Sequence, residues 1–366
     1  MEVIINSFVY NVFQDIENAL VKGGTGSETF QSTRYSDSDL LLFKKQRRLT
    51  TAKCIALWNK QNRSTTSGDI VKKYLGIYLK TPNETRWNSL FDSTKHLLLN
   101  FKKNPGVFLR MCDDLNVSRF NKSDTEWLED YVFIMEPLAI CLDILQGDKS
   151  MYFGFLVPSI SQLITKYSNM KQSRGFNVNG PLIDIIKNSL IKRFSVMLSD
   201  PFLVVAAVSH PFFKTQWCDE TNKDFAIKTF TDAVVEMHAN LSDVKNTISS
   251  ETTECDENYE ISENNFFPWS NKNSINVPIE NEISTYLSKS PNKLLLSLNE
   301  TPSIKSVFIK YNTPLPSSAS VERVFSVGSA VLTKKRGRMS DQNFGKVMLL
   351  KCNKNVFVKL FVYLKL

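Results

Sequence analysis

Apolar residues recur at every third or fourth position after Thr125, the spacing that places them on one face of an α-helix. Ser123 and Glu126 form an S-x-x-E pattern that predicts a capping box at the helix start, and Gly147 follows its predicted end. Pro137 lies inside the pattern, so we expect either a kink or two successive helices. The apolar positions of the stripe are Trp127, Tyr131, Ile134, Leu138, Cys141 and Leu145.

A second helix is predicted to begin at Pro181, because proline is typical of a first helical turn, and to stop at Asp200-Pro201. Its apolar face comprises Ile183, Ile186, Leu190, Phe194 and Met197. Together with the apolar stretches "PSISQLITKY" and "FLVVAAV", these patterns predict a largely helical block from about residue 120 to about residue 215.

Strand-like sequence is sparse and is confined to two short segments. These are "GIYLK" at residues 76–80 and the alternating tail "VFVKLFVYLKL" at 356–366. The acidic stretch at 249–282 has little apolar periodicity and many Asn, Ser and Glu residues, so it cannot bury enough surface to offset the entropy of ordering, and we expect a linker there. The predicted fold class is therefore mainly α with a minor β part (α+β).

Helical spacing returns after the acidic stretch. It is present over residues 304–311 and 321–332, which the turn "PLPSS" separates, and again from Ser340 onward.

The composition indicates a globular chain. Its 366 residues are 42% hydrophobic, which is enough for a sizeable core divided among two or three units. No apolar run approaches the roughly 18 residues of a membrane span, so we expect no membrane partner and no signal peptide. The six cysteines lie far apart without a C-x-x-C pair, which predicts reduced thiols of an intracellular protein and no metal site.

Three patches, taken in order, resemble the hAT transposase superfamily. They are "TRWNS" at residues 85–89, the region from "MEPLAICLDIL" to "HPFFKTQW" at 135–217, and "PSSASVERVFSVGSAVLTKKRGR" at 316–338. The likeness covers roughly residues 50 to 355, and the third patch is the most specific. It is similar to the C-terminal dimerisation region of that superfamily.

The resemblance implies a ribonuclease H-like core interrupted by a long helical insertion. On that basis we expect residues 1–84 to be an N-terminal remnant of the core and 85–217 to be the helical insertion domain. Residues 218–283 would be an acidic flexible linker, and 284–366 the C-terminal dimerisation region. Active members of the superfamily bind divalent metal with an Asp-Asp-Glu triad.

Glu322 corresponds to the final glutamate of that triad. The two aspartates would lie upstream of residue 85, each beside a core strand, but Asp15, Asp37, Asp39 and Asp69 follow no β-branched apolar run. A two-metal site needs several carboxylates, so we expect Glu322 to be a vestigial catalytic position in a protein without a cofactor. The alternatives are an ordinary glutamate near a helix N-terminus and an active transposase that uses Mg²⁺ or Mn²⁺.

The resemblance places a dimer interface on the helix around Glu322. The apolar residues on its face are Val321, Val324, Phe325, Gly328 and Leu332. Gly328 lowers helix propensity by about 1 kcal/mol relative to Ala, so we expect a close neighbouring backbone there. The alternative is that this face is ordinary intramolecular core.

The C-terminal end is basic, with 12 Lys and Arg against 2 Asp and Glu over residues 301–366, in a chain of net charge +8. The cluster Lys334, Lys335, Arg336 and Arg338 is predicted to contact DNA phosphates or to direct nuclear import, and otherwise to be a solvated loop. The sequence thus predicts a nuclear, hAT transposase-derived protein whose main surviving activity is dimerisation. An active DNA transposase and a non-catalytic DNA-binding protein remain open alternatives.

Overall fold

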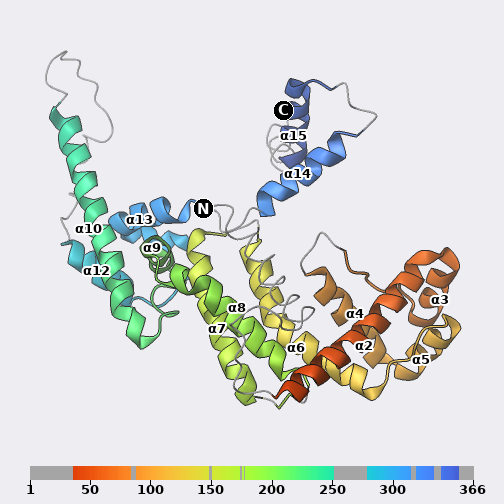
Figure 1. Ribbon diagram of the computed structural model, residues 1–366. Helices are drawn as coiled ribbons and strands as arrows, with labels where there is room; N and C mark the ends of the chain where they lie inside the picture. Colours follow the sequence, from red (N-terminus) through yellow and green to blue (C-terminus); the bar gives the residue numbers. More distant parts are fainter. Residues whose placement is uncertain are drawn as a thin grey trace. The chain divides into compact units, whose positions relative to one another are not determined.

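The computed structural model describes residues 36–83, 88–147, 151–173, 175–176, 178–250, 278–314, 319–333 and 339–353 (Figure 1). In these ranges every regular element is a helix and there is no strand, so the mainly α prediction is confirmed and the minor β part is wrong for them. The "GIYLK" segment is irregular because Gly76 ends a helix in the left-handed conformation, with φ 74°, and its N–H donates to the carbonyl of Lys72. The other predicted strand, 356–366, lies outside the described residues.

The chain divides into two compact units. The first takes its residues from 1–151, 166–190 and 315–366, and the second from 152–165 and 191–314. The expected insertion domain, 85–217, and the expected dimerisation region, 284–366, therefore each contribute to both units. No helix in the described ranges is long and apolar enough to cross a membrane.

The first unit is a set of packed helices. They are α2 (Asp37–Arg63), α3 (Thr65–Leu75), α4 (Ser89–Lys103), α5 (Pro105–Asp114), α6 (Lys122–Leu145), parts of α7 (Leu156–Ser173) and α8 (Gly180–Leu198), α14 (Ala319–Val331) and α15 (Asp341–Cys352). The remnant of a ribonuclease H-like core expected in residues 1–84 is not what the described part shows, because α2 and α3 occupy almost all of it. Their apolar residues are spaced for helices and not for strands.

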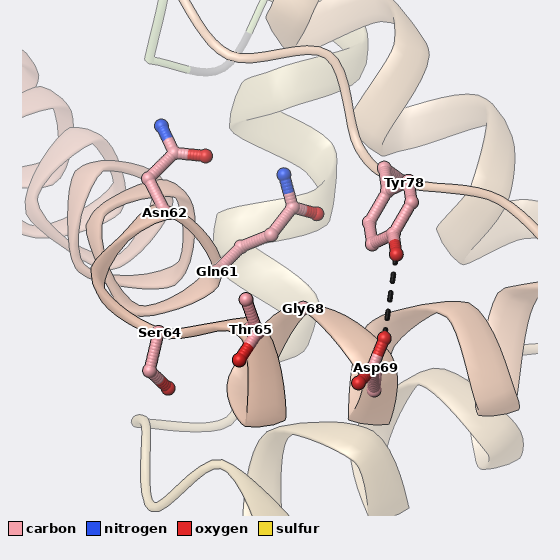
Figure 2. A pocket seen from close by; sticks show the side chains of 7 residues that line it. All are labelled: Gln61, Asn62, Ser64, Thr65, Gly68, Asp69 and Tyr78. Atoms are coloured by element: carbon pink, nitrogen blue, oxygen red, sulfur yellow. Dashed lines mark hydrogen bonds between the residues drawn. The ribbon is translucent and has the colours of Figure 1, made fainter.

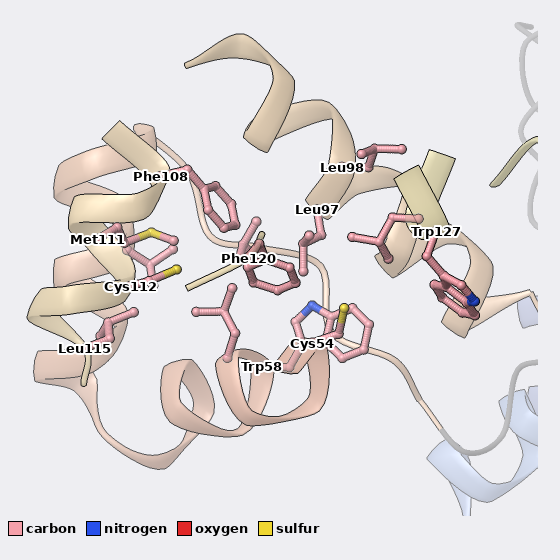
Figure 3. Packing of buried hydrophobic residues seen from close by; sticks show 14 residues of the cluster. Cys54, Trp58, Leu97, Leu98, Phe108, Met111, Cys112, Leu115, Phe120 and Trp127 are labelled. Atoms are coloured by element: carbon pink, nitrogen blue, oxygen red, sulfur yellow. The ribbon is translucent and has the colours of Figure 1, made fainter. Parts of the chain in front are cut away.

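The core of this unit is aromatic and sulfur-rich (Figure 3). Trp58 and Cys54 of α2 belong to one buried cluster with Leu97 of α4, Met111 of α5 and Trp127 of α6. The rings of Phe101, Phe108 and Phe120 pack against one another, Phe108 edge-on to each of the other two. A rigid helical scaffold therefore holds α2 and α3 in place.

The buried carboxylate of Asp124 joins α6 to α2. It accepts hydrogen bonds from the Thr50 hydroxyl, at 2.8 Å, and from the Lys53 ammonium. It also forms the capping box of α6 with Asn121, so the predicted Ser123–Glu126 box is wrong by two residues. The short Asn121 side chain reaches the N–H of Asp124, and α6 then runs as one helix through Pro137.

The second unit contains the remaining elements. They are η1 (Phe153–Phe155), α9 (Pro201–Ser209), α10 (Glu220–Ser250), α12 (Ile279–Ser288), η2 (Leu295–Glu300) and α13 (Pro302–Asn312). The prediction of a flexible linker from residue 218 is wrong over α10 and α12. Ala226, Phe230 and Val234 recur every fourth residue and are buried, so an amphipathic helix forms although its other face is acidic. Residues 251–277 lie outside the described part.

Gly154 lies where η1 packs tightly against α9 and α13 of the second unit. Its N–H donates to Oδ1 of Asn312, at 2.8 Å, while Nδ2 of Asn312 donates to the carbonyl of Ala206, at 3.0 Å. A Cβ at position 154 would lie 2.3 Å from that carbonyl oxygen. Only glycine fits between η1, α9 and α13.

His210 follows α9 and is buried among the rings of Tyr152, Phe155, Phe213 and Phe308. Burial lowers the pKa of its imidazole from 6.5 to about 4. The ring is therefore neutral near pH 7, and its Nδ1 accepts the N–H of Phe212 at 3.2 Å.

Candidate self-association surface

Helices α14 and α15 form a hairpin by packing against each other (Figure 1). Ser340 caps α15, because its hydroxyl oxygen accepts the N–H of Asn343 at 3.4 Å. The two helices have 13 and 12 residues. Helices of this length are marginal in water unless an apolar face is packed.

Gly328 belongs to the contact within the hairpin. A Cβ built at this position would lie 3.4 Å from Cζ of Phe344 and 3.7 Å from Cε of Met348, both on α15. Its expected close neighbour is therefore not a second backbone but two side chains of the same chain. Gly328 and Val331 are the buried residues of α14 among those whose side chains the structure describes, and α15 has no buried residue.

The other four residues of the predicted interface are exposed. Val321, Val324 and Phe325 lie in the N-terminal half of α14, and Leu332 directly follows the helix. Phe325 is the most exposed, at 69% of its surface. These four side chains, three on α14 and one directly after it, are together called the exposed face of α14, and within the described residues α15 does not bury them.

Glu322 lies in the first turn of α14 and is exposed. The guanidinium of the next residue, Arg323, donates to the carbonyl of Gln146 at 2.7 Å. Of the upstream aspartates, Asp39 is used in the cap of α2 with Ser36, and Asp69 accepts from the Tyr78 hydroxyl. The described ranges hold no group of three or more His, Cys, Asp or Glu side chains arranged to bind a metal ion.

The basic cluster and the cysteines are the remaining residues that the sequence analysis singled out. Lys334, Lys335, Arg336 and Arg338 lie outside the described residues, as do Asp15 and Cys255. The five described cysteines carry free thiols. Burial raises the pKa of Cys54 and Cys141 to about 12, and of Cys112 and Cys218 to about 11, so these four thiols stay protonated at neutral pH.

One surface was not predicted. Residues 36–110 contain 15 Lys and Arg against 5 Asp and Glu, so this block alone exceeds the net charge of the whole chain. A pocket opens within it, where α2 ends and α3 begins (Figure 2). The basic block can be found in the sequence by counting charges by segment over the first third of the chain. The pocket cannot, because it depends on the fold.

No protein-family model matches the chain, and none of the curated proteins is similar enough to match it.

Proposed function

We propose that this chain is a hAT transposase-derived protein that associates with a second copy of itself through the exposed face of α14. The observation that carries the proposal is the exposure of Val321, Val324, Phe325 and Leu332 on a short helix. The resemblance of residues 316–338 to a dimerisation region supports the same assignment.

The energetics favour a partner for the hairpin. Full burial of a fully exposed Val, Leu or Phe side chain contributes about 1.5–3 kcal/mol. Because the four residues are 45–69% exposed, covering each of them contributes roughly half of that amount. The contact between Gly328 and α15 leaves the four side chains of the exposed face in water. A second α14 presents the same apolar side chains, and such self-complementary patches are the basis of two-fold dimers.

Photo-cross-linking tests which residues meet. A photoreactive phenylalanine analogue replaces Phe325 in a mixture of unlabelled and ¹⁵N-labelled full-length chains. Cross-linked peptides that join a light chain to a heavy chain within residues 319–353 are the expected result. The same analogue at Val196, which is exposed on α8, is the control and is expected to give none. Cross-links that join only peptides of one chain would contradict the proposal.

We further propose that the protein does not cleave or join DNA. The support is the position of its upstream carboxylates: Asp37 and Asp39 lie in the first turn of α2, and Asp69 lies in α3, not beside strands. Incubation of the full chain with DNA ends and Mg²⁺ or Mn²⁺ is expected to give no nicked product. Metal-dependent nicking that is lost in Glu322→Gln would contradict this and support the transposase alternative.

A further inference from the structure

Helices α2 and α3 of the basic block carry exposed basic side chains, which are together called its basic side. Lys45, Arg48 and Arg63 of α2 are exposed, and so are Lys72 and Lys73 of α3. No ion pair is recorded between any of these five side chains and a carboxylate in the described residues, whereas Lys53, Lys95 and Lys102 pair with acids of α6. The electrostatic field of this side therefore favours a polyanion.

The pocket at the α2–α3 junction has a volume of about 400 Å³ (Figure 2). It is lined by Gln61, Asn62, Ser64, Thr65, Gly68, Asp69 and Tyr78. Most of these side chains carry hydrogen-bonding groups, and one is a flat aromatic ring. A volume of this size is at the lower end of the range for small-molecule sites and suits one nucleotide.

The chain segment that carries Tyr78 is held firmly. The side-chain amide of Gln61 donates to the carbonyl of Leu79, at 2.9 Å, and its oxygen accepts the N–H of the same residue, at 2.8 Å. Gly68 lets the ring approach α3, since a Cβ there would lie 3.2 Å from Cε1 of Tyr78. The ring is thus preorganised although it is half exposed.

The Tyr78 ring lies beside hydrogen-bonding groups and an ammonium group, so three kinds of contact with a nucleotide are available there. The Tyr78 hydroxyl donates to Asp69 at 3.4 Å, and Nζ of Lys72 lies 5.5 Å from the ring centroid. An aromatic face stacks on a nucleobase, amide and carboxylate groups bond to its edge, and ammonium groups attract the flanking phosphates. The carboxylate of Asp69 repels phosphate, so the base and not the phosphate would enter the pocket.

We propose that this basic side of α2 and α3 binds single-stranded nucleic acid. One unpaired base stacks on Tyr78 and contacts Asn62 and Asp69, and the neighbouring phosphates lie against Arg63, Lys72 and Lys73. A base inside a duplex is stacked on both faces and cannot enter such a pocket, so the site prefers a single strand. This binding is independent of self-association through α14.

Fluorescence anisotropy with the full chain tests the proposal. The probes are labelled oligouridine and oligothymidine of about 16 nucleotides, the upper site size for one binding module, and a duplex of equal length. Measurements run from about 50 mM to about 200 mM salt, the range over which phosphate contacts lose most affinity. The single strands are expected to bind at least about tenfold more tightly than the duplex.

Substitutions separate the ring from the charges. Tyr78→Phe keeps the stack and the affinity, whereas Tyr78→Leu weakens binding about tenfold. In the double variant Lys72→Gln/Lys73→Gln the slope of log affinity against log salt becomes shallower by about 0.7 for each lost phosphate contact. The matched control is Lys310→Gln, because the Lys310 ammonium also lies over a tyrosine ring, 5.3 Å from the centroid of Tyr311, but on α13 of the second unit. It is expected to change neither quantity.

A photo-cross-linking experiment uses the unmodified chain and therefore does not depend on whether Tyr78→Leu folds. Strands that carry 5-iodouracil are expected to cross-link the unmodified chain at Tyr78, identified by peptide mass. Equal affinity for duplex and single strand, unchanged binding by folded Tyr78→Leu, cross-links elsewhere only, or no binding at low salt would each overturn the proposal.

Discussion

Helices α9 and α14 both carry several apolar residues, but these residues lie in different environments. Seven of the nine residues of α9 are buried, in contact with η1, α10 and α13. In α14 the exposed face carries Val321, Val324 and Phe325, while Gly328 and Val331 are buried, Gly328 beside Phe344 and Met348 of α15. The comparison shows that apolar spacing predicts a helix that must be covered, and that only the fold tells whether the same chain covers it.

The largest expected effect is on the covered side of this comparison, at Gly154. Gly154→Ala places a Cβ 2.3 Å from the Ala206 carbonyl, and because η1 and α9 must separate, the free energy of unfolding should fall by about 3 kcal/mol or more. Urea unfolding followed by circular dichroism measures the change.

The matched control lies on α15. Gly345 has no heavy atom within 4 Å of a built Cβ, so Gly345→Ala should raise helix stability by about 1 kcal/mol. Equal effects of the two alanines would show that packing in the second unit is no tighter than in the hairpin.

Acid should weaken the second unit through His210. Burial lowers its pKa to about 4, whereas in the unfolded chain the imidazole takes up a proton as the pH falls through about 6.5. Between these values the unfolded state binds more protons, so the free energy of unfolding decreases as the pH falls, by roughly 3 kcal/mol in total. Urea unfolding at several pH values measures this loss, and His210→Asn should remove most of it. An unchanged pH dependence in that variant would show that other groups cause it.

Gly328→Ala distinguishes a contact within the hairpin from a contact between chains. The added Cβ meets Phe344 at an ordinary 3.4 Å, and the helix gains about 1 kcal/mol of propensity, so the variant should fold and self-associate as before. Size-exclusion chromatography with light scattering provides the measurement. Loss of the dimer in a folded Gly328→Ala chain would mean that Gly328 faces the second copy.

The smallest effect is expected at Glu322. The carboxylate is exposed in the first turn of α14, where the helix dipole favours a negative charge by about 0.3–1 kcal/mol. Glu322→Gln should lower the melting temperature slightly and leave self-association unchanged. A large loss of either property would give this carboxylate a structural role that its exposure does not indicate.

Much of the helical framework could be predicted from the sequence. The patterns at Ile183 and Ile304 correspond to α8 and α13, because their apolar residues repeat with the helical period and are buried. Sequence alone does not show that residues 76–80 are irregular, because the hydrogen bonds between the Gln61 side chain and the backbone of Leu79 join positions 18 residues apart. Helix α10 was not predicted, because its residues were grouped with the acidic stretch that follows it into one expected linker.

The candidate site was predicted only in part. The spacing of Val321, Val324 and Phe325 is visible in the sequence, but their exposure depends on where α15 packs. Gly328 was assigned to the interface because its low helix propensity implies a close neighbour, and sequence alone does not say that the neighbours are Phe344 and Met348. The pocket at Tyr78 arises from the junction of α2 and α3 and has no local sequence pattern.

The most direct test of the central claim is sedimentation of the full chain over a range of concentrations, with Phe325→Asp and the control Val196→Asp. Both residues are exposed, Phe325 at 69% and Val196 at 79%, so neither charge should unfold the protein. We predict that the unmodified chain and Val196→Asp form a dimer, whereas Phe325→Asp sediments as a folded monomer. A monomeric unmodified chain, or a Phe325→Asp variant that dimerises as well as the control, would contradict the account.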